Sequence, residues 1–348
     1  GCVPKKILWN AAEVAQHLHH ATDYGWPVPA AGTFDWAGLG RKRAAYLERL
    51  RGIYAGQLEQ RGIVHIPAAG ELLGDGRVRA GALVLHAPHI VIATGGIPYR
   101  PDVPGAELGL TSDDFFALPA LPARAAVVGA GYIAVELASV LASLGSAVTL
   151  FVRGDRLLRN FDDRLGEALA AAFERQGIRI RFRHALAGLE RQADGRVAVI
   201  GADGERASFD ALFWATGRVP NLDGIGLDRV GLISDDKGVL PVDAASGTAV
   251  PGIHAIGDVT GEPALTPVAI AAGRRLAERL KAAGLRVWLD EWVIKPGDII
   301  ALEVDEGLEQ SRVLLLCISP AALASGWVSE EEFELWVRPQ DMTGPRRV

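Results

Sequence analysis

The sequence predicts an α/β fold built on parallel sheets. Apolar strands alternate with helices along the chain, which is typical of β–α–β units. An internal echo adds to this pattern, because one apolar strand runs into residues 93–96 (ATGG) and a later one into residues 215–218 (ATGR). Small residues after a strand let the backbone pass close to a ligand where a Cβ atom would clash. The echo favours two related nucleotide-binding domains, and two ordinary strand-to-turn exits are the alternative.

Five helices and strands are expected in the first 152 residues. They are a helix over residues 7–20, strands over 89–93 and 125–128, a helix over 132–144 and a strand over 147–152. Residues 118–123 contain two prolines, which interrupt regular structure just before the strand at 125. We therefore expect a domain boundary in that segment.

Composition limits the classes of partner and compartment. The 348 residues allow two or three domains, and a net charge of -6 argues against nucleic acid or an anionic membrane as a partner. No apolar run approaches the roughly 20 residues that span a bilayer. Cys2 and Cys317 are the two cysteines, so a disulfide framework is excluded and a reducing compartment, the cytoplasm, is expected. No metal site is predicted.

Residues 125–134 carry the strongest motif. They follow the order strand, glycine turn, helix start and match G-x-G-x-x-A, the dinucleotide-binding pattern of Rossmann folds. Gly129 allows the tight turn, Gly131 lets a pyrophosphate approach the backbone, and Ala134 keeps helix and strand close. The free N–H groups at the helix start then face the phosphates.

The next strand indicates which dinucleotide is bound. An NAD site would end this strand in Asp or Glu to accept from the ribose 2′-OH. Here the strand ends in Val152 and is followed by Arg153, with a second guanidinium at Arg159. Two arginines suit a 2′-phosphate, so NADPH is predicted over NADH. Two solvated surface arginines are the alternative.

Several motifs together resemble one family. In chain order they are GCVPKK, Asp23-Tyr24-Gly25, ATGG, VVGAGYIAVE, LFVRGDRLLRNFD, ATGRVPN and AIGDVTGEPALTPVAIAAGR. They resemble bacterial glutathione reductase, a flavoprotein disulfide reductase. The resemblance implies two Rossmann-like domains that bind FAD and NADPH. It also implies a C-x-x-x-x-C redox centre in which Cys2 is the second, flavin-facing thiol, whereas a lone cysteine is otherwise usually inert.

The resemblance also assigns roles to individual residues. Lys5 would pair with Glu136 beside the flavin N5, and Tyr132, four residues before Glu136 on one helix face, would gate the nicotinamide. Asp258 would hydrogen-bond the ribityl chain of FAD, and Thr266 would lie near the flavin ring. The remaining implied positions are Thr94, Gly95 and Arg218 for cofactor, and Tyr54 and Arg274 for glutathione disulfide. An ordinary core tyrosine, a capped loop or a surface arginine is the alternative for Tyr54, Thr266 and Arg274.

After Arg274 the chain leaves this pattern. Residues 285–292, 296–298, 313–320 and 325–331 resemble bacterial TIR domains, which implies a partial, flavodoxin-like segment. By its place in W-x-x-x-E, Glu331 would be the glutamate of NAD-cleaving members. A solvated acidic helix face over residues 330–334 is the alternative.

Four parts are expected. They are an incomplete FAD-binding domain (1–118), an NADPH-binding domain (119–244), a return segment of the FAD-binding domain (245–279) and a partial TIR domain (280–348). The first FAD glycine motif, the attacking cysteine and the family's dimerisation domain are not found in these residues. Activity and homodimer formation are therefore expected to be impaired in the chain as given, and FAD binding is left open.

The leading hypothesis is an NADPH-dependent flavoprotein disulfide reductase that acts on glutathione disulfide. The alternatives are a TIR protein that cleaves NAD or makes TIR–TIR contacts, and an inactive chimera that keeps only nucleotide binding. The join is expected within residues 274–280, and natural fusion and misassembly both remain open.

Overall fold

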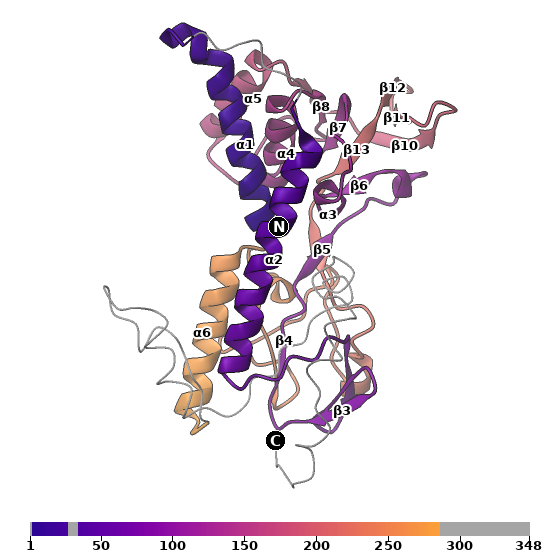
Figure 1. Cartoon of the computed structure of the whole chain (residues 1–348). Coiled ribbons are helices and arrows are strands. Elements are labelled where there is room, and N and C mark those ends of the chain that lie inside the picture. The colour runs from indigo at the N-terminus through magenta and orange to yellow at the C-terminus, as the bar shows by residue number, and fades with distance from the viewer. Residues whose placement is uncertain (1, 27–33, 286–348) are drawn as a thin grey trace. The chain divides into compact units, whose positions relative to one another are not determined.

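The computed structural model describes residues 2–26 and 34–285 (Figure 1). Contacts divide the chain into two units, each assembled from two separate stretches. The first unit contains Gly1–Arg49 and Pro98–Gly217, and the second contains Leu50–Ile97 and Arg218–Val348. The TIR-like motifs, Cys317 and Glu331 lie outside the described residues.

The first unit is built on a five-stranded parallel sheet. In spatial order its strands are β6 (Leu110–Thr111), β13 (Ala211–Trp214), β7 (Arg124–Val128), β8 (Ala147–Phe151) and β9 (Arg179–Arg181). From β7 the chain winds to one side through β8 and β9, whereas β13 and β6 lie on the other side. Doubly wound sheets bind ligands at the carboxyl ends of the strands where this order reverses. That place is the glycine turn after β7.

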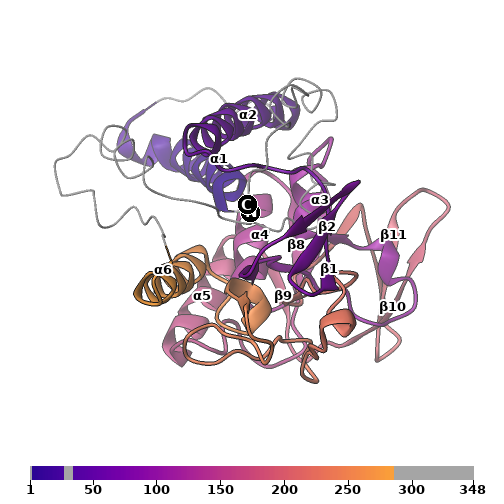
Figure 2. The same ribbon diagram turned by 90° about the horizontal axis from the view of Figure 1, so that it is seen from below.

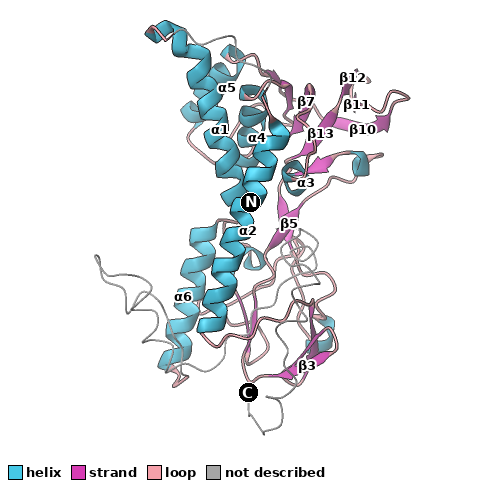
Figure 3. Ribbon diagram, viewed as in Figure 1, coloured by secondary structure: helices cyan, strands magenta, loops and turns pink. Residues whose placement is uncertain are grey.

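The two faces of this sheet are covered differently, because side chains alternate along each strand. Ala125 and Val127 pack in a core with the helices, whereas Ala126 packs in a separate core with an antiparallel three-stranded sheet. The helices are α1 (Cys2–His20), η1 (Ala21–Tyr24), α2 (Trp36–Gln60, which continues into the second unit), η2 (Ala106–Leu108), α3 (Ser112–Phe116), α4 (Tyr132–Ser143) and α5 (Asp163–Arg175). Figure 3 shows α1, α4 and α5 together on one side of β7 and β13.

The antiparallel sheet comprises β10 (Leu186–Arg191), β11 (Val197–Gly201) and β12 (Arg206–Phe209). Figure 2 shows β10 and β11 side by side.

The second unit has its own core. Parallel strands β4 (Ile90–Ile92) and β15 (Ile253–Ala255) pair with Ile90 opposite Ile253, and these two residues pack with Leu72 and Leu240. The other elements are β1 (Gly70–Gly74), β2 (Arg77–Ala80), β3 (Leu83–His86), β5 (Gly96–Pro98), β14 (Arg218–Pro220), η3 (Asp228–Val230), η4 (Gly257–Thr260) and α6 (Thr266–Ala282).

Most of the expected elements agree with the structure. The predicted strands at 89–93, 125–128 and 147–152 correspond to β4, β7 and β8, and the helix at 132–144 corresponds to α4. The first helix differs, because α1 begins at Cys2 instead of Ile7. Pro4 lies in its first turn, where the missing N–H would have no helical partner in any case.

The grouping of residues also differs from the expected four parts. Residues 1–49 group with 98–217, and within that unit α1 buries Leu8 and Ala12 in the same core as α4. The functional boundaries at 118, 244 and 279 stay predictions. Helix α6 runs unbroken through residues 274–280, where the join was expected. Among the helices described, none has the length and apolarity that crossing a membrane requires.

Candidate functional site

The glycine turn after β7 has the shape that a dinucleotide site needs. Gly129 donates its N–H to the Phe151 carbonyl at 3.0 Å, and its φ is +147°. A Cβ atom at this position would lie 2.2 Å from the Ala215 carbonyl oxygen, whereas a Cβ at Gly131 would meet nothing within 4 Å. Gly131 is the N-cap of α4, and Ala134 is fully buried. The turn is closed on one side and open on the other, where a pyrophosphate would approach.

The loop between β8 and α5 is tied to this turn. Leu158 donates its N–H to the Ala130 carbonyl at 2.8 Å. Arg153 and Arg159 are exposed. Among the described residues, neither guanidinium forms an ion pair or hydrogen bond. This loop therefore carries two uncompensated cations next to a candidate phosphate site, which is the charge that an anionic group requires.

Lys5 and Glu136 form the predicted pair. Lys5 Nζ lies 2.8 Å from Glu136 Oε1, and both side chains are about 30% exposed. A second hydrogen bond between the same helices joins Gln16 Nε2 to Ser143 Oγ at 2.9 Å. Together they fix α1 along α4. The expected role of the pair at the flavin stays a prediction.

The helices α1 and α4 begin with two further expected site residues, a redox cysteine and a tyrosine that would gate the nicotinamide. Cys2 is exposed at the first position of α1. Tyr132 is 40% exposed at the first position of α4.

In the second unit the strand exit at Thr94 is held by an asparagine that is distant in the sequence. Thr94 Oγ1 donates to the Asn221 carbonyl at 2.6 Å, and Asn221 Nδ2 donates to the Thr94 carbonyl at 3.3 Å. The Asn221 backbone N–H donates to the Gly95 carbonyl at 2.9 Å. Asn221 is 9% exposed. It ends the ATGRVPN motif, but the sequence alone did not single it out.

Asp258 lines a cavity of about 210 Å³ with Gly96, Arg218 and Lys237. Arg218 Nε lies 4.0 Å from Asp258 Oδ2, and the Arg218 guanidinium also donates to the Gly96 carbonyl. A Cβ atom at Gly96 would lie 3.0 Å from Asp258 Oδ2. The second glycine of the ATGG motif thus leaves room for the carboxylate, which can accept hydrogen bonds from hydroxyl groups.

The remaining expected residues of the second unit lie on helices. Tyr54 is 55% exposed on α2. Thr266 is the exposed first residue of α6, and Arg274 is half-buried on the same helix. Their expected contacts with flavin and substrate stay predictions.

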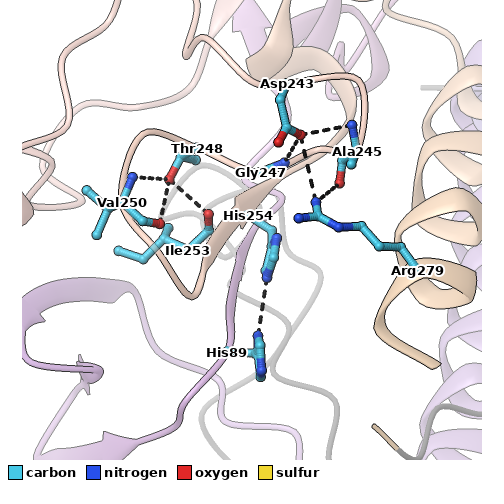
Figure 4. Close-up of polar contacts among 9 residues, drawn as sticks. All are labelled: His89, Asp243, Ala245, Gly247, Thr248, Val250, Ile253, His254 and Arg279. Atoms are coloured by element: carbon cyan, nitrogen blue, oxygen red, sulfur yellow. Dashed lines mark hydrogen bonds and ion pairs between the residues drawn. The ribbon is translucent and has the colours of Figure 1, made fainter. Parts of the chain in front are cut away.

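The strand that leads to Asp258 carries a buried histidine (Figure 4). His254 Nε2 lies 3.3 Å from His89 Nδ1. Burial lowers the pKa of His254, and the neighbouring His89 and Arg279 lower it further. On the adjoining turn, backbone N–H groups of Gly247 and Ala245 hold the pKa of the Asp243 carboxyl below its usual range.

One further polar group lies between the parallel sheet and the β10–β12 sheet. His184, Asp203 and Glu205 have ligand atoms within 4.8 Å of one another. Arg181 donates to both Glu205 carboxylate oxygens, and this hydrogen bonding lowers the pKa of Glu205. The Glu205 carboxylate is thus already paired with Arg181.

The glycine turn and the paired helices are what a pyridine-nucleotide enzyme requires. The chain belongs to the pyridine nucleotide-disulphide oxidoreductase family, whose sequence profile matches residues 1–273. It is 40% identical over 288 residues to glutathione reductase of Schizosaccharomyces pombe, a match that covers 80% of this chain and 62% of that protein. It is 38% identical over 301 residues to glutathione reductase of Yarrowia lipolytica, covering 80% and 63%.

The structure resembles that of the HOCl-induced flavoprotein disulfide reductase RclA from Escherichia coli, solved as a Cu(II) complex. The TM-score is 0.71 at 25% identity, and the match covers 80% of this chain and 61% of RclA. The chain thus spans about three fifths of the length of the proteins it matches.

A second profile, that of the TIR domain, matches residues 269–348. The two matches meet at residues 269–273, within α6. The predicted change of family is confirmed, and it lies a few residues before the expected join.

Proposed function

We propose that this protein is an NADPH-dependent flavoprotein disulfide reductase that acts on glutathione disulfide. The observation that carries the proposal is the pairing of Lys5 with Glu136 at 2.8 Å. It links the helix that starts with Cys2 to the helix that starts at the nucleotide-binding turn. A disulfide reductase needs these two functions, a redox cysteine and a nicotinamide site, on one rigid support.

NADPH would be held by the turn and the β8–α5 loop. Gly131 leaves room for the pyrophosphate, Gly129 lets the turn pack against Ala215, and the N–H groups at the start of α4 would donate to the phosphates. Arg153 and Arg159 would bind the 2′-phosphate. Tyr132, exposed at the start of α4, would cover the nicotinamide.

The donor set also fits FAD. Asp258 lines a cavity with a carboxylate that can accept from ribityl hydroxyls, while Gly96 leaves the space that a side chain would fill. Bound FAD would supply the two-electron relay between NADPH and a disulfide. Lys5 would present its ammonium group to the flavin with its direction set by Glu136, and Cys2 would be the flavin-facing thiol of a redox pair. Exchange with a disulfide substrate also needs the attacking thiol, which these residues do not contain.

Substrate, partners and location follow from relatives and composition. The two glutathione reductases named above support glutathione disulfide as substrate, with Tyr54 and Arg274 as binding residues, and support the dimer usual in that family. With only Cys2 and Cys317 in the chain, a reducing compartment such as the cytoplasm fits best.

The decisive experiment mixes the FAD-reconstituted chain with NADPH or NADH without oxygen and follows the loss of flavin absorbance. We expect faster reduction by NADPH, and a loss of about tenfold or more of this preference in Arg153→Glu, since a charge-assisted contact is removed. Arg175→Glu, an exposed arginine at the end of α5, makes the same charge change as a control. Equal rates of flavin reduction by NADPH and NADH would refute the assignment of Arg153 and Arg159 to the 2′-phosphate of NADPH. Because the attacking cysteine is not found in these residues, we expect little or no NADPH oxidation that depends on glutathione disulfide. Oxidation that needs glutathione disulfide and disappears in Cys2→Ser would contradict this expected impairment and would show that the chain turns over this substrate.

A second function is favoured by the TIR match over residues 269–348. We propose that this segment derives from an NAD-cleaving or partner-binding domain, with Glu331 as its catalytic glutamate. We expect no nicotinamide release from NAD, because an oxocarbenium-like transition state is stabilised only by a carboxylate held against the ribose. Robust release that is lost in Glu331→Ala and kept in Glu334→Ala would show instead that the segment is a working enzyme.

A further inference from the structure

A third arginine lies between Arg153 and Arg159 and is bound differently. Arg156 is in the same β8–α5 loop, and its guanidinium donates to the carboxylate of Asp163, the first residue of α5. Its other terminal nitrogen donates to the Arg159 carbonyl at 3.2 Å. One side chain therefore joins the backbone that carries Arg159 to the start of a helix. Its charge is compensated by Asp163, whereas those of Arg153 and Arg159 have no such partner among the described residues.

The rest of the loop is held at two adjacent residues. Leu157 is 1% exposed, and α5 approaches so closely that a Cβ atom on Gly166 would lie 2.5 Å from the Leu157 carbonyl. Leu158 adopts a φ of +50°, a left-handed conformation disfavoured for a bulky side chain. Its N–H nevertheless reaches the Ala130 carbonyl at 2.8 Å. A backbone in this conformation persists when surrounding contacts determine it.

We propose that Arg156 and Asp163 form a positioning clamp that sets the specificity for NADPH. The clamp holds the loop in the one conformation that leaves Arg153 and Arg159 available for the 2′-phosphate, and Arg156 itself does not touch the cofactor. The proposal rests on the proposed function, since it assumes that this loop receives NADPH. A loop without the clamp populates this conformation for only a fraction of the time, and the affinity for the phosphate falls by that fraction.

The test compares dissociation constants of NADPH and NADH for the full 348-residue chain and three variants, Arg156→Gln, Asp163→Asn and the double variant. Each single variant should lose about fivefold of the NADPH preference, the size expected for a partly exposed ion pair that orders a loop. The affinity for NADH should be unchanged, which also shows that the glycine turn is folded. The double variant should lose no more than either single one, because both changes break the same clamp.

Two controls separate positioning from charge. Arg164→Gln removes an exposed positive charge from the first turn of α5 and should keep the preference. Arg156→Lys keeps the charge but cannot span both acceptors, so it should lose most of the preference.

Each other outcome contradicts the clamp. If Arg156→Gln loses the preference while Asp163→Asn keeps or raises it, Arg156 contacts the phosphate directly and the clamp is refuted. Full preference in Arg156→Lys, or in both single variants, refutes it as well. A wild-type chain that binds NADH as tightly as NADPH would overturn the proposed cofactor and the clamp together, and so is distinguishable from failure of the clamp alone.

Discussion

Gly129 and Gly131 stand two residues apart in one turn, yet an added methyl group would meet different surroundings at each. At Gly129 it would lie 2.2 Å from a backbone carbonyl oxygen, on a residue whose φ of +147° already excludes most side chains. At Gly131 it would project into open space from an ordinary extended backbone. The first glycine is therefore required by the fold, and the second is required only if a ligand approaches.

This difference gives a matched pair of substitutions. Gly129→Ala should destabilise the protein by about 3 kcal/mol or more, because neither the backbone nor the Ala215 carbonyl can move freely. Gly131→Ala should change stability by less than about 0.5 kcal/mol but weaken NADPH binding severalfold. Urea unfolding and NADPH titration measure the two effects. Gly131→Ala with unchanged NADPH affinity would count against a pyrophosphate at this turn.

At the scale of elements, the strand pair β4–β15 combines burial with a titrating group. His254 is 6% exposed, its Nδ1 is buried without a hydrogen-bond partner, and Arg279 approaches through the turn at Asp243. The titratable and charged groups that face His254 are thus His89, Arg279 and Asp243, and of these only Asp243 favours protonation of the His254 imidazole. The neutral imidazole is the form that this strand pair accommodates.

The lowered pKa of His254 determines how the stability of the protein changes with pH. Because the folded pKa of His254 lies below that of an unfolded histidine, about 6.5, the unfolded state binds more protons in the window below that value. Stability is full above about pH 6.5 and is lost as the pH falls through the window towards the folded pKa. His254→Gln should reduce this loss, whereas His65→Gln at an exposed position should keep it. Urea unfolding from about pH 7.5 to about pH 5 gives the curves, and identical slopes for wild type and His254→Gln would exclude the mechanism.

At the scale of the whole molecule, each unit is formed by packing together two stretches that are distant in the sequence. In the first unit α1 contributes Leu8 to the core that α4 and the parallel sheet share. The part of the chain that carries the glycine turn thus packs against the helix that carries Cys2. Residues 119–244, although they contain the whole glycine motif, are not the full packing unit.

Two substitutions on α1 test this packing. Leu8→Ala should lower the free energy of unfolding of the first unit by about 2–4 kcal/mol, since it leaves a cavity at a residue that is 1% exposed. Val14→Ala on the same helix, 57% exposed, should cost less than about 0.5 kcal/mol. Equal stability of the two variants would mean that α1 is not part of this core.

Local patterns made the first strands, α4 and the glycine turn predictable from sequence. Each depends on short-range physics, namely side-chain periodicity and the backbone freedom of glycine. The family motifs likewise placed Lys5 opposite Glu136. The start of α1 lies five residues before the expected Ile7, and its first turn includes Pro4, which that part of a helix tolerates.

Only the tertiary structure decided which distant segments contact one another. No local pattern shows that residues 1–49 group with 98–217, that Asn221 bonds to the Thr94 turn, or that His254 stacks on His89. The three arginines after β8 look alike in sequence, and the structure alone separates Arg156, bound to Asp163, from Arg153 and Arg159. The sequence determined the chemical groups and local conformations, whereas packing decided which groups are compensated, because burial and pairing depend on neighbours that folding brings together.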